Sequence, residues 1–192
     1  MVITIVFFFW PALQALKQSL FQGDAFGLIQ RFVGLENFKE LLFSSLYHQS
    51  ILVTVLFSFS VTLLTLMLGL LMAVLVNEII RGKLAYKALL IWPYAVAPAV
   101  AGLLWRFFFN PAVGWGSYLL RKIGIDWNYY VHPAQAMTVV VIASSWQQFS
   151  YNFLFFFAGL QAIPLSLLEA ASIDGANAWQ RFWHVSFPLL AP

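Results

Sequence analysis

Polar side chains that could bind a small molecule gather in one apolar stretch of the sequence, residues 136–157. Gln148, Tyr151 and Asn152 have the i, i+3, i+4 spacing of a single helix face. Amides buried without partners in an apolar environment are costly, so this face should point into the protein. It can line a path for a solute, or it can hold neighbouring helices together through hydrogen bonds. The sequence leaves both interpretations open.

A second region with chemical potential is the apolar run 88–105 and the arginine that follows it. Pro93 and Pro98 predict a kink or break, because proline lacks an N–H donor and clashes with the preceding turn. Such breaks often line transport paths, although a simple packing kink would have the same sequence. Tyr94, between the prolines, could face a solute. Arg106 could attract an anion such as a phosphoester, or, more simply, extend to the membrane surface.

The sequence contains no pattern typical of catalysis or of a metal site. It has no nucleophile–base pair and no close pair of carboxylates, and His48, His132 and His184 lie in different segments. No GxxxxGK[ST] sequence is present, so we expect no ATP to be bound by this chain itself. The absence of cysteine excludes disulfides and thiolate ligands, and the basic residues are too scattered to indicate nucleic acid. We therefore predict neither an enzyme nor a cofactor-binding chain.

The composition indicates a membrane protein. Of the 192 residues, 62% are apolar and 9% are charged, whereas a soluble domain has about 25% charged residues. Stretches of about 20 mostly apolar residues predict helices that span the membrane, and continuous apolar runs favour helices over alternating barrel strands. The fold class expected is all-α, a polytopic helical bundle of about four transmembrane helices. The spans are predicted at about 1–20, 50–77, 87–109 and 136–158.

The connecting segments predict an orientation. The short segment 78–87 carries Arg81, Lys83 and Lys87 against Glu78, and basic short loops stay in the cytoplasm. Loops 21–49 and 110–135 would then lie outside the membrane, and 159–192 would lie in the cytoplasm.

A short helix is expected inside the first outer loop. Asn37 could cap it, with Phe38, Leu41 and Leu42 on one face. Such a helix could lie at the membrane interface or be an ordinary loop helix.

The segment after the fourth span is predicted to form two helices joined by a turn. Pro164 suits a first helical position, and Gly175 can end that helix because it tolerates positive φ. Asn177 can cap the second helix and Pro188 should break it. Four apolar residues should supply packing contacts, namely Leu165, Leu167, Leu168 and Ile173. The segment is aromatic and weakly charged. This composition predicts either a docking surface for a partner or a hairpin packed on its own membrane domain.

The same segment resembles the EAA signature of permease subunits in binding-protein-dependent ABC importers. The resemblance is carried by Glu169, Ala170, Ala171, Asp174, Gly175, Val185 and Pro188, with Phe187 where leucine is usual. It implies that 159–192 is a cytoplasmic coupling loop that inserts into a cleft on the ATPase subunit. Glu169, Ala170, Ala171, Asp174, Gly175 and Pro188 would then belong to that contact.

Other stretches extend the resemblance along the chain. FVGLENF at 32–38, WPYAVAPAVAGLLW at 92–105 and FNP at 109–111 resemble the carbohydrate-uptake permeases. PYAVAPAVAGLLW, together with SYNFLFFFAGLQAIPLSLLEAASIDGA at 150–176, resembles permeases for sn-glycerol 3-phosphate.

The resemblance implies a transport subunit of the bacterial inner membrane, with several partners. These are a dimer of ATP-binding subunits, a second permease subunit and a periplasmic solute-binding protein. Because the family has six spans, we expect the chain to be truncated, without its last two spans and part of its first, and unable to transport by itself. A neutral sugar is the alternative solute. A secondary carrier or channel without an ATPase is the alternative class, which the coupling signature disfavours.

Overall fold

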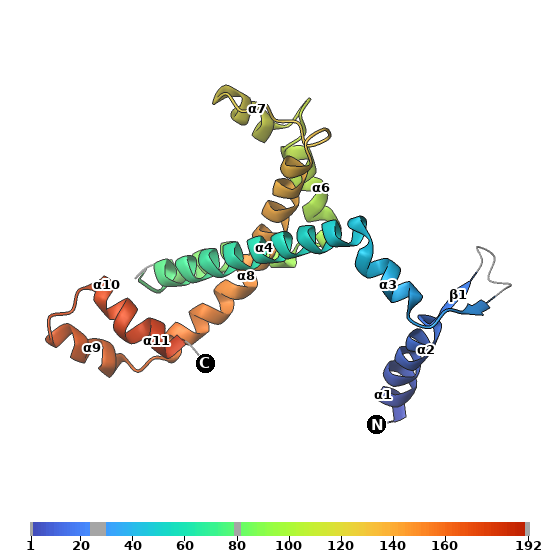
Figure 1. The fold of residues 1–192 in the computed structure, drawn as a ribbon. Coiled ribbons are helices and arrows are strands. Elements are labelled where there is room, and N and C mark those ends of the chain that lie inside the picture. Colours follow the sequence, from blue (N-terminus) through green and yellow to red (C-terminus); the bar gives the residue numbers. More distant parts are fainter. Residues whose placement is uncertain (1, 24–29, 79–81, 191–192) are drawn as a thin grey trace. The chain divides into compact units, whose positions relative to one another are not determined.

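A computed structural model describes residues 2–23, 30–78 and 82–190, so that Arg81 of the basic segment 78–87 lies outside the described residues. The chain divides into two compact units, residues 1–56 and 57–192. Figure 1 shows the helices and strands of both units.

The first unit begins with a helical segment of three parts. These are α1 (Val2–Thr4), a π-helix η1 (Ile5–Phe9) and α2 (Trp10–Gln18). Two short strands that the sequence did not predict follow, β1 (Phe21–Gly23) and β2 (Gln30–Phe32), paired antiparallel. Phe21 lies opposite Phe32, and their ring centroids are 5.3 Å apart, which is the kind of cross-strand aromatic pair that stabilises a hairpin.

The expected short helix is α3 (Glu36–Phe43), but the prediction that Asn37 caps it is wrong. The N-cap position is Leu35, which makes no side-chain cap. Asn37 instead donates its amide N–H groups to the carbonyls of Ser19 at 2.8 Å and Phe21 at 3.1 Å. Carbonyls at the end of a helix lack intrahelical partners, and the Asn37 amide supplies a hydrogen bond to the one at Ser19. This contact depends on the tertiary arrangement.

The longest helix is α4 (Ser45–Glu78), of 34 residues, which contains the whole of the predicted span 50–77. Its buried face repeats about every four residues, with Val61, Thr65, Gly69, Ala73 and Val76. A Cβ at Gly69 would lie 2.8 Å from the Cβ of Asn152. Small residues therefore allow α4 to cross the later helix α8 (Pro133–Ala162) at very short range.

The predicted third span is two helices, α5 (Lys83–Ala95) and α6 (Pro98–Phe108), bent by 98°. The predicted break is confirmed and lies between Ala95 and Pro98. Pro98 opens α6, where its missing N–H costs nothing, and Pro93 stays inside α5. Gln147 of α8 donates its side-chain N–H to the carbonyl of Val96 at 2.6 Å. The break thus receives a hydrogen bond from another helix, as membrane proteins require.

Beyond α6 lie α7 (Trp115–Lys122) and the 30-residue helix α8, against which α5 and α6 both pack. Ala73 and Val76 of α4 pack with Phe153, Phe157 and Leu160 of α8 to form the core. The chain then turns through 69° into α9 (Leu165–Ile173). The remaining elements are α10 (Ala178–Arg181), a π-helix η2 (Phe182–Ser186) and α11 (Phe187–Leu190).

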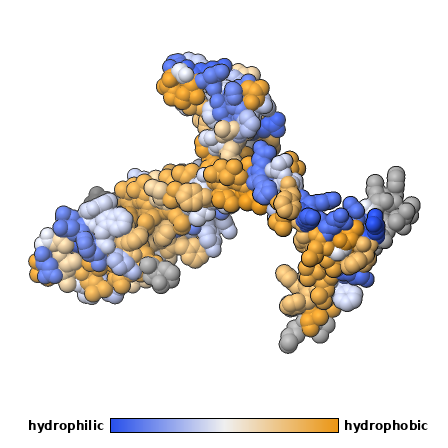
Figure 2. Space-filling model, in the orientation of Figure 1, coloured by the Kyte–Doolittle hydropathy of each residue, from blue (hydrophilic) through white to orange (hydrophobic). Residues whose placement is uncertain are grey.

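The helices have the length and surface of membrane spans. Among the described residues, α4 is long and apolar enough to cross a membrane by itself, and there are three such spans if each bent pair, α5–α6 and α8–α9, counts as one. Large apolar side chains are exposed along them, and Figure 2 shows a largely hydrophobic surface there, with hydrophilic residues gathered near α7 and α9. The first predicted span, on α1 to α2, remains a prediction.

Candidate functional site

The turn between α9 and α10 is closed by backbone hydrogen bonds. Gly175 has φ +84°, and its N–H donates to the carbonyl of Ser172 at 3.1 Å, while the N–H of Ala176 donates to Ala171 at 3.0 Å. This pair of bonds is the Schellman ending of a helix, which calls for a residue that tolerates positive φ. The prediction that Gly175 ends the helix is confirmed.

The second helix of this segment begins as predicted, with Asn177 as its cap. The backbone N–H of Gln180 donates to the Asn177 side chain at 2.9 Å, and the Gln180 side chain accepts from the backbone N–H of Asn177 at 2.9 Å. Two donors at the helix start are thereby satisfied reciprocally.

Arg181 links the two helices, which the sequence reasoning missed. Its guanidinium donates to the hydroxyl of Ser172 at 2.8 Å and to the carbonyl of Ala176 at 3.4 Å. The one available signal was an arginine shortly after the expected turn. α9, the turn and α10 are consequently held as one body, defined here as the coupling segment, residues 165–181.

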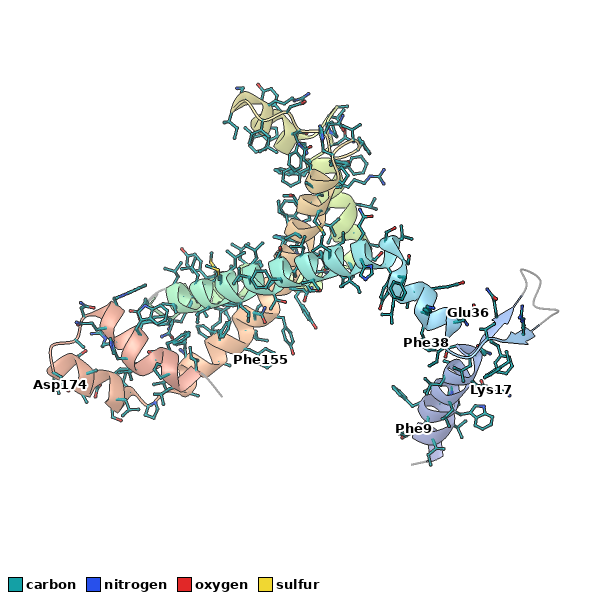
Figure 3. The ribbon with its side chains drawn as sticks, viewed as in Figure 1. Phe9, Lys17, Glu36, Phe38, Phe155 and Asp174 are labelled. Carbon is teal, nitrogen blue, oxygen red and sulfur yellow. The ribbon has the colours of Figure 1, made fainter. Side chains whose placement is uncertain are left out.

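The residues of the EAA signature are mostly exposed. Glu169, Ala170, Asp174, Gly175 and Pro188 are exposed and Ala171 is half-buried. Asp174 lies at the turn that joins α9 and α10 (Figure 3).

Three predictions about this part of the chain are wrong in detail. Pro164 occupies the N-cap of α9 rather than its first position. Pro188 lies inside α11 and breaks nothing, since the Phe187 N–H bonds back to Phe182, and this wider π-turn makes room for the proline ring. Leu165, Leu167 and Ile173 were expected to supply packing contacts, but they are 66%, 44% and 86% exposed because α9 turns away from α8.

An aromatic cluster joins the coupling segment to the long helix α8. Trp183 lies 5.6 Å from Trp179 and 4.9 Å from Phe187, measured between ring centroids. Leu190, at the end of α11, packs against the core, and a Cβ at Gly159 of α8 would lie 2.7 Å from its side chain. Packed side chains therefore run from α10 through η2 and α11 to α8.

The structure brings together some of the predicted solute-path residues but not all. The rings of Tyr94 and Tyr151 lie 6.1 Å apart, and these side chains are 59% and 50% exposed. Gln148 is exposed, whereas Asn152 is half-buried against Gly69 of α4. Arg106 lies apart from this group, at the end of α6.

Arg106 borders a cavity of about 380 Å³ between α6 and α8. Tyr129 lines the cavity from the loop before α8, and Ser144 and Gln147 line it from α8 itself. On its other side, Arg106 borders a smaller cavity of about 240 Å³ together with Asn110 and Tyr130. Sequence reasoning missed Tyr129, Tyr130 and Asn110, because nothing in a loop sequence indicates which helix end it returns to.

Hydrogen bonds hold the tyrosines beside Arg106. The buried Trp127 donates its indole N–H to the carbonyl of Phe109 at 3.0 Å, and Gln135 fixes the same loop by donating to the carbonyl of Asp126 at 2.8 Å. The hydroxyl of Tyr129 lies 3.1 Å from the carbonyl of Arg106 and 3.2 Å from the hydroxyl of Tyr130, and can donate to either.

The two tyrosine hydroxyls differ in acidity. Burial raises the pKa of Tyr129, and the hydrogen bond with Tyr130 raises it further. The same bond lowers the pKa of Tyr130, and the nearby Arg106 lowers the pKa of Tyr130 further. Donation by Tyr129 therefore favours negative charge on its neighbour.

Within residues 2–23, 30–78 and 82–190, no three His, Asp or Glu side chains come together as metal ligands would.

Long apolar helices, one pair of them bent at a proline, together with an exposed helical turn, define a multi-pass membrane protein. Residues 42–192 match the family described as binding-protein-dependent transport system inner membrane component. The match extends over most of the chain, and this chain belongs to that family, as its EAA signature indicated.

Relatives are similar over the whole chain. It is 56% identical over 191 residues to the sn-glycerol-3-phosphate transport system permease protein UgpA of Rhizobium meliloti (strain 1021), and 50% identical over 192 residues to that of Escherichia coli O157:H7. All of the chain is covered in both cases, and the chain spans 65% of the length of these relatives.

Solved structures share the fold. A bacterial ABC transporter that imports the acidic polysaccharide alginate matches with a TM-score of 0.82 at 21% identity, over 98% of this chain and 64% of the other. The same transporter in complex with its alginate pentasaccharide-bound periplasmic protein matches with the same TM-score over 100% of this chain and 64% of the other. The expected helical permease fold is thereby confirmed.

Proposed function

We propose that this chain forms most of the membrane part of a permease subunit in an ATP-driven, binding-protein-dependent importer, and that the solute is sn-glycerol 3-phosphate. The observation that carries the proposal is the 50–56% identity, over every described element, to permeases named for this solute. The family description supports the involvement of a solute-binding protein.

The proposed mechanism is alternating access. A periplasmic binding protein delivers the solute to the outer face, and a dimer of ATP-binding subunits contacts the coupling segment on the cytoplasmic face. ATP is bound by those subunits and not by this chain, and a second permease subunit completes the path. In this proposal the spans are those predicted from the sequence, and residues 159–192 are cytoplasmic.

The geometry of the coupling segment supports this mechanism. Its signature residues are exposed to a partner, while Arg181 and the Schellman turn keep the segment rigid. Packing from Trp179 through Trp183 and Phe187, and of Leu190 against Gly159, connects the segment to α8. In the proposal α8 also lines the solute path with Gln148, Tyr151 and Asn152, Tyr94 of α5 lies beside Tyr151, and Arg106 lies at the end of α6.

Transport by the assembled importer tests the proposal. The full-length permease is co-expressed with its neighbouring importer subunits, and uptake of labelled sn-glycerol 3-phosphate is measured with maltose-type sugars as competitors. ATP-dependent uptake that sugars do not inhibit is expected, together with loss of uptake when the ATPase is inactivated. Uptake of a neutral sugar instead would contradict the solute, and uptake without an ATPase would contradict the class.

A further inference from the structure

Arg106 has the surroundings of a ligand-binding arginine rather than those of a structural one. Tyr129 and Tyr130 line the cavities that Arg106 borders, and among the described residues no carboxylate influences its guanidinium. Three other cations have partners of their own: Lys87 lies over the ring of Phe157, Lys122 lies over that of Tyr118, and Arg181 bonds to Ser172. Arg106 is exposed and borders two cavities.

The larger cavity suits a small polar molecule. Its volume of about 380 Å³ lies at the lower end of the range of about 300–1,000 Å³ typical of small-molecule sites. Most of its wall is apolar, formed by residues such as Ala101 and Val139, and its polar groups come from Arg106, Tyr129, Ser144 and Gln147.

The two ends of the cavity differ chemically. Arg106 and the hydroxyl of Tyr129 offer donors at one end. The guanidinium presents N–H groups in a planar fork that fits a phosphate in two-pronged fashion. Ser144 and Gln147 lie on α8 toward the proline break, where the Gln147 side chain also bonds to Val96. A molecule with an anionic head and a hydroxyl-bearing body matches this order of groups.

We infer that Arg106, with Tyr129 and Tyr130 beside it, forms an oxyanion site that receives the phosphate group of a small polyol phosphomonoester, whose hydroxyl-bearing part extends toward Ser144. The inference rests on the proposed function and names the residues that select the solute's charge. A phosphomonoester carries about −1.5 to −2 charges at neutral pH, which a lone arginine compensates only in part. Tyr129 therefore completes the site by turning its hydroxyl from the Arg106 carbonyl to a phosphate oxygen. In the proposed orientation the site lies at the outer end of its span, where an arriving solute meets it.

Uptake and ATP hydrolysis, measured together on the complete importer in proteoliposomes, test this assignment. The variants are Arg106→Gln, which removes the charge, Arg106→Lys, which keeps a charge but not the fork, and Tyr129→Phe, which removes one hydroxyl. Arg121→Gln, an exposed arginine of α7 that borders neither cavity, is the matched control. The probe is labelled sn-glycerol 3-phosphate, loaded on the binding protein.

Arg106→Gln is expected to lower uptake at least about tenfold, which corresponds to the loss of one charge-assisted contact. Stimulation of ATP hydrolysis by the loaded binding protein should stay within about twofold of the unmodified importer, because coupling lies elsewhere. Arg106→Lys should retain more uptake than Arg106→Gln, Tyr129→Phe should lose about threefold or more, and Arg121→Gln should be unchanged.

Unchanged uptake by Arg106→Gln would overturn the inference. An equal loss of uptake and of stimulated ATP hydrolysis would also overturn it, because Arg106 would then have a structural role. If Arg106→Gln does not assemble, Tyr129→Phe decides the question, and full uptake by that variant would overturn the inference. Failure of the unmodified importer to take up the phosphoester is a different result, which would overturn the proposed function itself.

Discussion

Gly69 is the residue on which the approach of two long helices depends. The Cβ that alanine adds at this position would lie 2.8 Å from the Asn152 Cβ and 3.0 Å from the Phe153 backbone nitrogen. Neither neighbour is the flexible end of a side chain, so the helices α4 and α8 have to separate. Asn152 is consequently tied to helix packing, whatever part it takes in a solute path.

We expect Gly69→Ala to destabilise the permease by about 1–3 kcal/mol, the usual cost of overpacking. Gly102→Ala is the matched control, because a Cβ there meets nothing within 4 Å and alanine is the better helix former. Thermal unfolding of both variants in detergent measures the difference. A Gly69→Ala protein as stable as Gly102→Ala would contradict the close crossing.

At the scale of single elements, the α9–α10 turn depends on a backbone conformation that proline cannot adopt. Gly175 has φ +84°, whereas proline is restricted to about −65° and lacks the N–H that donates to Ser172. Gly175→Pro should therefore open the turn and separate α9 from α10.

The expected result is that Gly175→Pro no longer retains the ATP-binding subunit in a pull-down from membranes. Gly124→Pro is the control, since Gly124 has an almost equal φ of +83° and also donates to a backbone carbonyl, that of Arg121, but belongs to the loop before α8. Equal retention by the two variants would count against the coupling segment as the ATPase contact.

The break between α5 and α6 is a second element whose geometry can be tested. Gln147→Leu would leave the half-buried Val96 carbonyl without its 2.6 Å hydrogen bond, and the loss of a hydrogen bond costs about 0.5–1.5 kcal/mol. Gln148→Leu alters the neighbouring amide, which is exposed.

We expect the unfolding temperature to fall with Gln147→Leu and to stay nearly constant with Gln148→Leu, as measured by thermal unfolding in detergent. Similar losses in both variants would show that the amide of Gln147 does not support the break.

At the scale of the whole molecule, the orientation in the membrane is open to a direct test. The chain has no cysteine, so single cysteines can be introduced without background labelling. Val113, in the loop after α6, and Ile173, in the coupling segment, are 77% and 86% exposed.

A membrane-impermeant thiol reagent should label Val113→Cys from the periplasmic side, whereas Ile173→Cys should react only after the cytoplasmic side is opened. If both cysteines were labelled from the same side, the number of spans between them would be even. That result would contradict the predicted orientation.

Much of this protein can be read from its sequence, because the physical signals are local. Long runs without charges determine where apolar helices form, proline determines where the third one breaks, and glycine and asparagine at 175 and 177 determine the turn in the coupling segment. Each of these effects acts within a few residues, so neighbours along the chain are sufficient to predict it. The EAA signature is also a continuous stretch, which is why the family was evident before any fold.

Only the tertiary structure decided which distant groups meet. Asn37 bonds to the carbonyls of Ser19 and Phe21 instead of capping its own helix, and Gln147 supports a break more than fifty positions earlier in the chain. The cavity at Arg106 exists because the loop before α8 returns Tyr129 and Tyr130 to the end of α6. Such contacts depend on how helices pack and where loops lead, and packing is governed by the shapes of all the surfaces involved. No spacing within a single segment encodes them.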